Sequence, residues 1–180
     1  MLNIGTSHRK MQEPRGGLWS LGVDGRLTQL DDDIHLGNGP CWSHDDAVLY
    51  HADSLRHTIY AYDYDIETGA AGNRRPFFDS SAYGPIPDGA TVDSDGNVWT
   101  AICEGGVVLC LSPQGKVIRE VAFPTSIPAS CMFMGPNLDQ LFVPTIDPGF
   151  MGRPSAPDDG MNFLIEGLGV TGLPEPRYGG

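Results

Sequence analysis

Residues 93–99 read Asp-Ser-Asp-Gly-Asn-Val-Trp, and this short stretch decides the fold class. Its Asp-Gly pair supplies the positive φ of a tight hairpin turn, and the apolar residues that follow are typical of a buried strand. A similar unit, a polar turn followed by an apolar strand ending in an aromatic residue, recurs at 43–50 and 135–142. Recurrence every ~40–50 residues, with about four strands per repeat, is typical of β-propeller blades.

Outside these units the apolar residues still alternate with polar ones, and further hairpin turns are expected at Asp24-Gly25 and Gln114-Gly115. No segment has the spacing of an amphipathic helix. We therefore predict an all-β chain, a β-propeller of about four blades. A β-sandwich, the alternative, would explain the strands but not the recurring unit.

The composition excludes several classes of protein. The net charge is −12, which argues against a nucleic-acid partner and against docking on anionic lipid. No apolar run is long enough for a signal peptide or a membrane-spanning helix, so a cytoplasmic protein is expected. The four cysteines lack zinc-site spacing and are expected to be free thiols, although a Cys103–Cys110 bridge across one hairpin stays open.

Two short segments place an oxygen-bearing side chain beside a glycine. They are centred on Asn38 and Asp88, and each precedes a turn-strand unit, so both side chains are expected on the same rim of a propeller. An amide oxygen and a carboxylate there would suit a hard divalent cation. Asn-Gly and Asp-Gly are also common turn formers, and that simpler interpretation stays open.

Other polar residues receive structural interpretations. His51 and Asp53 alternate along a strand and are expected to make structural hydrogen bonds rather than to bind a metal. Asp31-Asp32-Asp33 lacks the ligand spacing of an EF-hand and is predicted to be a solvated turn. Ser43 has no Gly-x-Ser-x-Gly setting, which argues against a serine hydrolase.

Several motifs in register resemble one known family. The segment Asn38–Ser43 matches the pattern NG-x-x-WS, and the match continues through 59–65, 73–75, 87–89, 93–101 and 169–174. These segments resemble the senescence marker protein/gluconolactonase/regucalcin-like family over nearly the whole chain from Gly5 onward. The resemblance implies a six-bladed propeller with a divalent metal on its axis, in enzymes that usually hydrolyse sugar lactones.

The resemblance also assigns the two oxygen donors. Asn38 and Asp88 correspond to two of the family's metal ligands, whereas the third ligand, a Glu of the first blade, has no counterpart here. Residues 1–180 are accordingly predicted to be a partial six-bladed propeller without its N-terminal blades, and substrate-binding residues stay unknown.

The function expected from this resemblance is a metal-dependent lactonase. Asp88 would be the catalytic residue, binding the cation (Ca, Zn, Mn or Mg) together with Asn38 and taking a proton from water. The alternatives are a non-catalytic calcium-binding or assembly protein and an inactive fragment of a longer lactonase. The expected partners are a small sugar lactone and a second copy, bound through open propeller edges.

Overall fold

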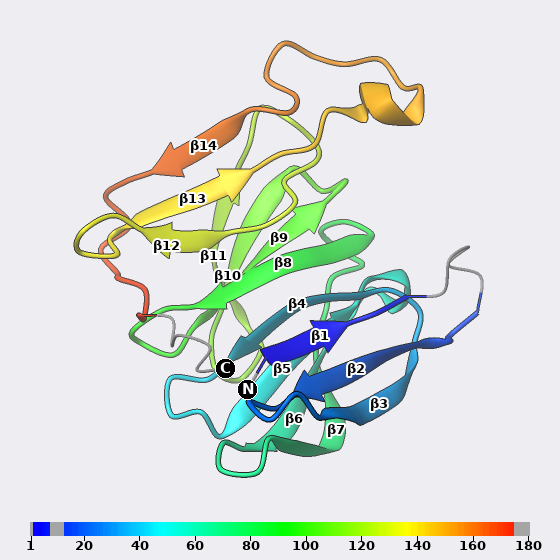
Figure 1. Cartoon of the computed structure of the whole chain (residues 1–180). Coiled ribbons are helices and arrows are strands. Elements are labelled where there is room, and N and C mark those ends of the chain that lie inside the picture. Colours follow the sequence, from blue (N-terminus) through cyan, green and yellow to red (C-terminus); the bar gives the residue numbers. More distant parts are fainter. Residues whose placement is uncertain (1, 8–12, 175–180) are drawn as a thin grey trace.

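The computed structural model describes residues 2–7 and 13–174, and the elements in these ranges are strands and two short 3-10 turns (Figure 1). The strands form four antiparallel sheets, and each sheet is built from a continuous part of the chain. The all-β prediction is confirmed. The β-sandwich alternative is wrong, because four sheets are present rather than two.

Each sheet takes up its strands in the order in which they occur along the chain. The first sheet holds β1 (Leu2–Gly5), β2 (Gly16–Leu21) and β3 (Leu27–Ile34). The second holds β4 (Gly37–Trp42), β5 (Val48–Asp53), β6 (Thr58–Asp65) and β7 (Ala70–Asp79). The third holds β8 (Ile86–Val92), β9 (Val98–Cys103), β10 (Val107–Leu111) and β11 (Val117–Ala122). The last holds β12 (Met132–Met134), β13 (Gln140–Pro144) and β14 (Asn162–Ile165); the 3-10 turns are Ser54–Arg56 and Pro148–Met151.

The first strands of the four sheets lie next to one another. β1 contacts β4, β4 contacts β8, and β8 contacts β12 (Figure 1). The later strands of each sheet pair outward in sequence order. This arrangement is typical of β-propellers, and it gathers residues of the first strands at the centre.

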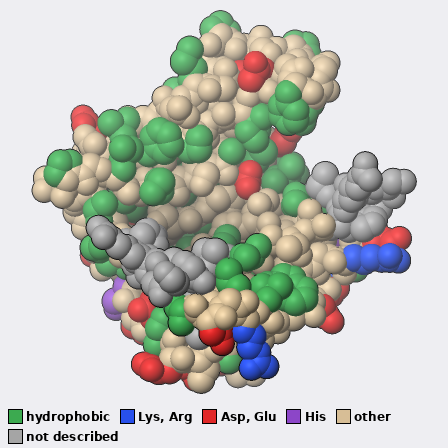
Figure 2. All heavy atoms as spheres, viewed as in Figure 1, with side chains coloured by type: hydrophobic (Ala, Val, Ile, Leu, Met, Phe, Trp, Pro, Cys, Tyr) green, Lys and Arg blue, Asp and Glu red, His purple; other side chains and the backbone are tan. Residues whose placement is uncertain are grey.

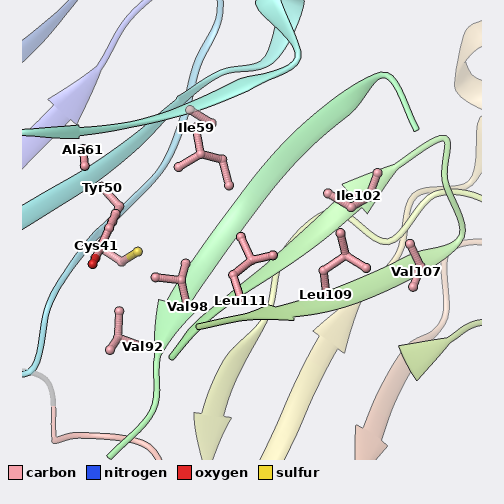
Figure 3. Close-up of a cluster of buried hydrophobic side chains, with 11 residues drawn as sticks. Cys41, Tyr50, Ile59, Ala61, Val92, Val98, Ile102, Val107, Leu109 and Leu111 are labelled. Carbon is pink, nitrogen blue, oxygen red and sulfur yellow. The ribbon is translucent and has the colours of Figure 1, made fainter. Parts of the chain in front are cut away.

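Hydrophobic side chains fill the spaces between the sheets. Val98 and Ile102 of β9 pack toward the second sheet, where they meet Tyr50 and Ile59 (Figure 3). The alternate residue Trp99 packs toward the last sheet. Because both faces of β9 are covered, every residue of this strand is buried.

The turn at residues 93–97 is fixed by a buried carboxylate. Asp93 is fully buried and accepts hydrogen bonds from the backbone N–H groups of Asp95 (3.0 Å) and Asn97 (2.8 Å). It also accepts one from the indole Nε1 of Trp99 at 2.8 Å. Gly96 has a φ of 83°, as the predicted turn requires. One side chain therefore joins the turn to the core.

The acidic run 31–33 lies at the end of β3, so the prediction of a solvated turn is wrong. Asp31 Oδ2 accepts from the hydroxyl of Tyr62 (2.7 Å) and from Arg74 (2.9 Å). Asp33 pairs with Arg56 (2.8 Å) and Arg74 (3.1 Å), and these guanidinium groups lower its pKa to about 2. We call Asp31, Asp33, Arg56 and Arg74 the arginine clamp, because it joins the first sheet to the second.

The four cysteines are free and buried, as predicted. Cys110 lies opposite Trp99 rather than Cys103, so the possible bridge is absent. Within residues 2–7 and 13–174, no helix is long and apolar enough to cross a membrane.

Candidate metal and active site

Asn38 lies on β4 at the start of a β-bulge. It is opposite Ala52 in β5, and the pairing register shifts before Cys41. Its Nδ2 donates a hydrogen bond to Ser54 Oγ at 2.9 Å. No described residue donates to Oδ1, so the amide oxygen keeps its acceptor capacity for another group.

Asp88 lies on β8 at a second bulge, between Pro87 and Ala90. The residue is half-buried, and its carboxylate has no hydrogen bond or ion pair with any described residue. Burial alone raises the pKa of Asp88 to about 6. A desolvated carboxylate without a partner is costly unless a cation or a proton compensates its charge.

Glycines bring the backbones of the first strands into contact around Asp88. A Cβ added at Gly39 would overlap the carbonyl oxygen of Asp88, and one added at Gly89 would overlap Ser130. Gly89 also donates its N–H to the carbonyl of Ala129 at 3.0 Å. The peptide of Asp88 is therefore held from both sides by backbone. Asn38 directly precedes Gly39, the glycine that contacts the Asp88 carbonyl.

Figure 2 shows a hollowed surface between the first and last sheets, in the region where β4 and β8 lie in Figure 1. Two other hollows of about 370 and 360 Å³ lie near outer turns, beside residues 68–71 and 167–171. Neither of these is lined by Asn38 or Asp88. The central position, with its uncompensated carboxylate, is the better candidate site.

The donor set fits a hard divalent cation in part. Amide and carboxylate oxygens are the ligands that Ca²⁺ and Mg²⁺ prefer, and the free Oδ1 of Asn38 and the unpaired carboxylate of Asp88 supply one of each. The described residues hold no cluster of three or more His, Cys, Asp or Glu side chains that could bind a metal. Asn38 and Asp88 would therefore need water or further groups to complete the coordination.

His51 and Asp53 have different surroundings in the structure. Asp53 makes the predicted structural hydrogen bonds, accepting from the backbone N–H groups of His35 (3.0 Å) and Leu36 (3.1 Å). The prediction is wrong for His51, which is fully buried and has no hydrogen-bond partner for either ring nitrogen among residues 2–7 and 13–174. Its ring lies against Gly5 and Gly37, and burial lowers its pKa to about 4.

Ser54 is the residue that the sequence analysis missed. Its hydroxyl accepts from Asn38 and donates to the carbonyl of Pro87 at 2.6 Å, so it links the two strands of the candidate site. The only signal in the sequence is its place directly after a strand, and that position does not reveal its partners.

Comparisons with known proteins identify the family of the chain. Residues 2–147 match the sequence profile described as the SMP-30/Gluconolactonase/LRE-like region. The chain belongs to the SMP-30/gluconolactonase/LRE-like family. Regucalcin of Sus scrofa is a member similar to this chain, 34% identical over 178 residues, which are 97% of this chain and 60% of the relative.

Solved structures of this SMP-30/gluconolactonase group share the architecture. A calcium-binding regucalcin from Agrobacterium tumefaciens superposes with a TM-score of 0.86 at 27% identity, covering 98% of this chain and 60% of its own. A gluconolactonase from Xanthomonas campestris gives a TM-score of 0.63 at 26% identity, covering 74% of this chain and 43% of its own. The chain thus spans about 60% of the length of the curated relatives it matches.

Proposed function

We propose that this chain supplies part of the active site of a metal-dependent hydrolase that opens a sugar lactone. The observation that supports this most is the half-buried carboxylate of Asp88, which has no partner among the described residues and belongs to a residue whose backbone meets Gly39, next to Asn38. In this proposal Asn38 and Asp88 bind the same divalent cation. Membership in a family that includes gluconolactonases supports the reaction class.

The chemistry proposed for Asp88 is general-base catalysis. A bound divalent cation would supply polarisation of the lactone carbonyl and stabilisation of negative charge. The Asp88 carboxylate accepts a proton from water, and the water oxygen bonds to the carbonyl carbon. The ring C–O bond then breaks, and the ring oxygen takes the proton back from Asp88 to become a hydroxyl. The net charge of −12 favours neutral lactones over anionic sugars.

Two protein oxygens are few for calcium, which normally takes six to eight. We therefore expect the 180-residue chain to bind a divalent cation more weakly than its longer relatives do. In this proposal the relatives' additional length supplies further ligands and the substrate contacts.

Lactone hydrolysis tests the proposal directly. Aldonolactone opening, followed by acid release with a pH indicator, should require Ca²⁺, Zn²⁺, Mn²⁺ or Mg²⁺ and should stop with a chelator. Asp88→Ala should lower the rate by about 100-fold or more, the usual range for loss of a general base. Asp95→Ala, which removes an exposed turn carboxylate, should leave the rate unchanged. Turnover that is unaffected by the chelator or by Asp88→Ala would contradict the proposal, and no turnover at saturating metal would favour the assembly function.

A second candidate function, assembly, is favoured by the outward faces of the end sheets. Phe133 and Leu141 pack against the third sheet, which leaves the alternate residues of the last sheet facing outward. We call these outward-facing residues the last-sheet face (Met132, Met134, Phe142 and Leu164). On the first sheet, four apolar residues that pair across the strands also share one face, which we call the first-sheet face (Ile4, Trp19, Leu21 and Leu27). Figure 2 shows hydrophobic side chains over both end sheets. We propose that these faces bind a second copy.

A further inference from the structure

The Ser54 hydroxyl is placed to control the side chain of Asn38. Ser54 is fully buried at the end of β5, and its backbone N–H donates to the carbonyl of Leu36 at 2.9 Å. Its Oγ is 2.9 Å from Asn38 Nδ2 and 2.6 Å from the carbonyl oxygen of Pro87. One hydroxyl thus contacts a side chain of β4 and the backbone of β8.

The direction of these hydrogen bonds follows from the donors and acceptors available. A carbonyl oxygen only accepts, so the single hydroxyl proton of Ser54 must be donated to Pro87. Ser54 Oγ then has only lone pairs to offer Asn38, and the atom facing it must be the donor Nδ2. The Pro87 carbonyl therefore fixes, through Ser54, which way the Asn38 amide is turned.

The consequence is that Oδ1 of Asn38 is directed away from Ser54 and keeps its lone pairs. With the opposite orientation, the amide would present an N–H₂ donor there, which repels a cation. The same hydroxyl holds β8 at Pro87, the residue before Asp88. Ser54 thus acts on both proposed ligands without being a ligand itself.

We propose that Ser54 is a positioning residue, which orients the Asn38 amide so that its oxygen faces a divalent cation shared with Asp88. This inference rests on the cation site of the proposed function. Groups that orient metal ligands typically change the affinity by ~10–100-fold when removed.

Calcium affinity of the full chain, measured by titration calorimetry, tests this role. Ser54→Ala should weaken Ca²⁺ binding by about 10-fold or more. Ser80→Ala is the matched control, because Ser80 is equally buried and its hydroxyl also bonds backbone carbonyls, those of His57 and Gly84. Ser80→Ala should leave the Ca²⁺ affinity unchanged even where it lowers stability.

An Asn38→Asp background separates orientation from general damage. A carboxylate presents oxygen on both sides, so no hydroxyl is needed to turn it. We expect Ser54→Ala to change Ca²⁺ affinity by less than about threefold in this background, well below the effect of a positioning group. Equal losses in both backgrounds would overturn the proposal.

Side-chain amide NMR reports the orientation without any metal. The Asn38 amide protons, assigned by their loss in Asn38→Asp, should exchange slowly in the wild-type chain and in Ser80→Ala, but faster in Ser54→Ala. If exchange accelerates while Ca²⁺ affinity is unchanged, the positioning role is wrong and the cation site stands. If the wild-type chain binds no Ca²⁺ at millimolar concentration, both the cation site and the role of Ser54 are overturned.

Discussion

Asp88 combines a proposed functional role with a cost in stability. Its folded-state pKa of about 6 lies above the ordinary 3.8, so the folded chain binds more protons than the unfolded chain between these values. The free energy of unfolding therefore falls as pH rises through this window, by up to about 3 kcal/mol. A functional carboxylate held in a partly desolvated place is a common source of such a trade-off.

We expect Asp88→Asn to stabilise the metal-free chain at pH 8 by roughly 1–3 kcal/mol, because the uncompensated charge is gone. The gain should disappear near pH 4, where Asp88 is protonated in the folded protein. Urea unfolding with a chelator at both pH values measures this. Added Ca²⁺ should raise the midpoint of the wild-type chain but not of the variant; a variant less stable at both pH values would contradict the prediction.

His51 has the opposite dependence on pH. Its folded-state pKa of about 4 lies below the ordinary 6.5, so the unfolded chain takes up the proton first as pH falls. The carboxylates of Asp31 and Asp53 favour the charged ring but only partly offset the burial. Stability should therefore decline by up to about 3 kcal/mol from pH 6.5 to 4.

Replacing His51 with Leu should remove this decline, because no buried ring then needs to be charged. The comparison belongs in the Asp88→Asn background, where the opposing titration of Asp88 is absent. Urea unfolding at several pH values between 7 and 4 gives the slope. An unchanged slope in His51→Leu would show that another group causes the loss at low pH.

At this scale the sequence singled out Asn38 and Asp88 as residues of one rim, because both lie beside glycine before a recurring unit; the structure places them on β4 and β8, which are in contact. The sequence could not predict that His51 has no hydrogen-bond partner in the part of the chain that the structure describes. Its surroundings come from Gly5 of the first sheet and Gly37 of the second, and no local pattern encodes that contact. Ser54 was missed for the same reason, since its acceptor on Pro87 belongs to another sheet.

At the scale of elements, the arginine clamp holds the first sheet against the second. Arg74 of β7 reaches both Asp31 and Asp33 of β3, while Leu18 of β2 packs on Leu49 of β5. Runs of aspartate usually indicate a turn, and the partners that stabilise them in a strand are distant in sequence. The existence of strands was therefore easier to predict than this one boundary.

Removing the clamp should loosen the first sheet selectively. We expect Arg74→Ala to speed amide hydrogen exchange in β2 and β3 and to cost about 1 kcal/mol, since the ion pairs are partly exposed. Exchange in β9 should be unchanged. Arg75→Ala is the control, because Arg75 pairs with Asp63 inside the second sheet. Equal effects of the two variants would contradict a role in joining sheets.

At the scale of the whole molecule, the two end sheets differ from the inner ones in having an apolar face that no other described sheet covers. Met132 and Leu164 are 49% and 51% exposed on the last-sheet face, and Leu27 is 53% exposed on the first-sheet face. Faces of this kind are normally buried against a neighbouring sheet. Sequence alternation predicted buried and exposed positions well but could not show which sheet face has no neighbour.

We expect the chain to self-associate as its concentration rises, through these faces. Leu164→Lys should shift the sedimentation profile toward monomer, because a charge would be buried in the contact. Ile66→Lys, at a residue 55% exposed in the β6–β7 turn, should have no effect. A wild-type chain that sediments as a monomer at every concentration would contradict the prediction.

The glycines around Asp88 have a consequence for how the family can change. Gly39 and Gly89 let main chain meet main chain at the centre, so direct backbone contact, together with the hydrophobic clusters, sets the spacing of the proposed ligands. Substitutions among those clusters can accumulate and alter melting temperature while the ligand geometry is preserved. Members of one family can thus differ in their hydrophobic clusters and still keep the same arrangement of residues at the centre.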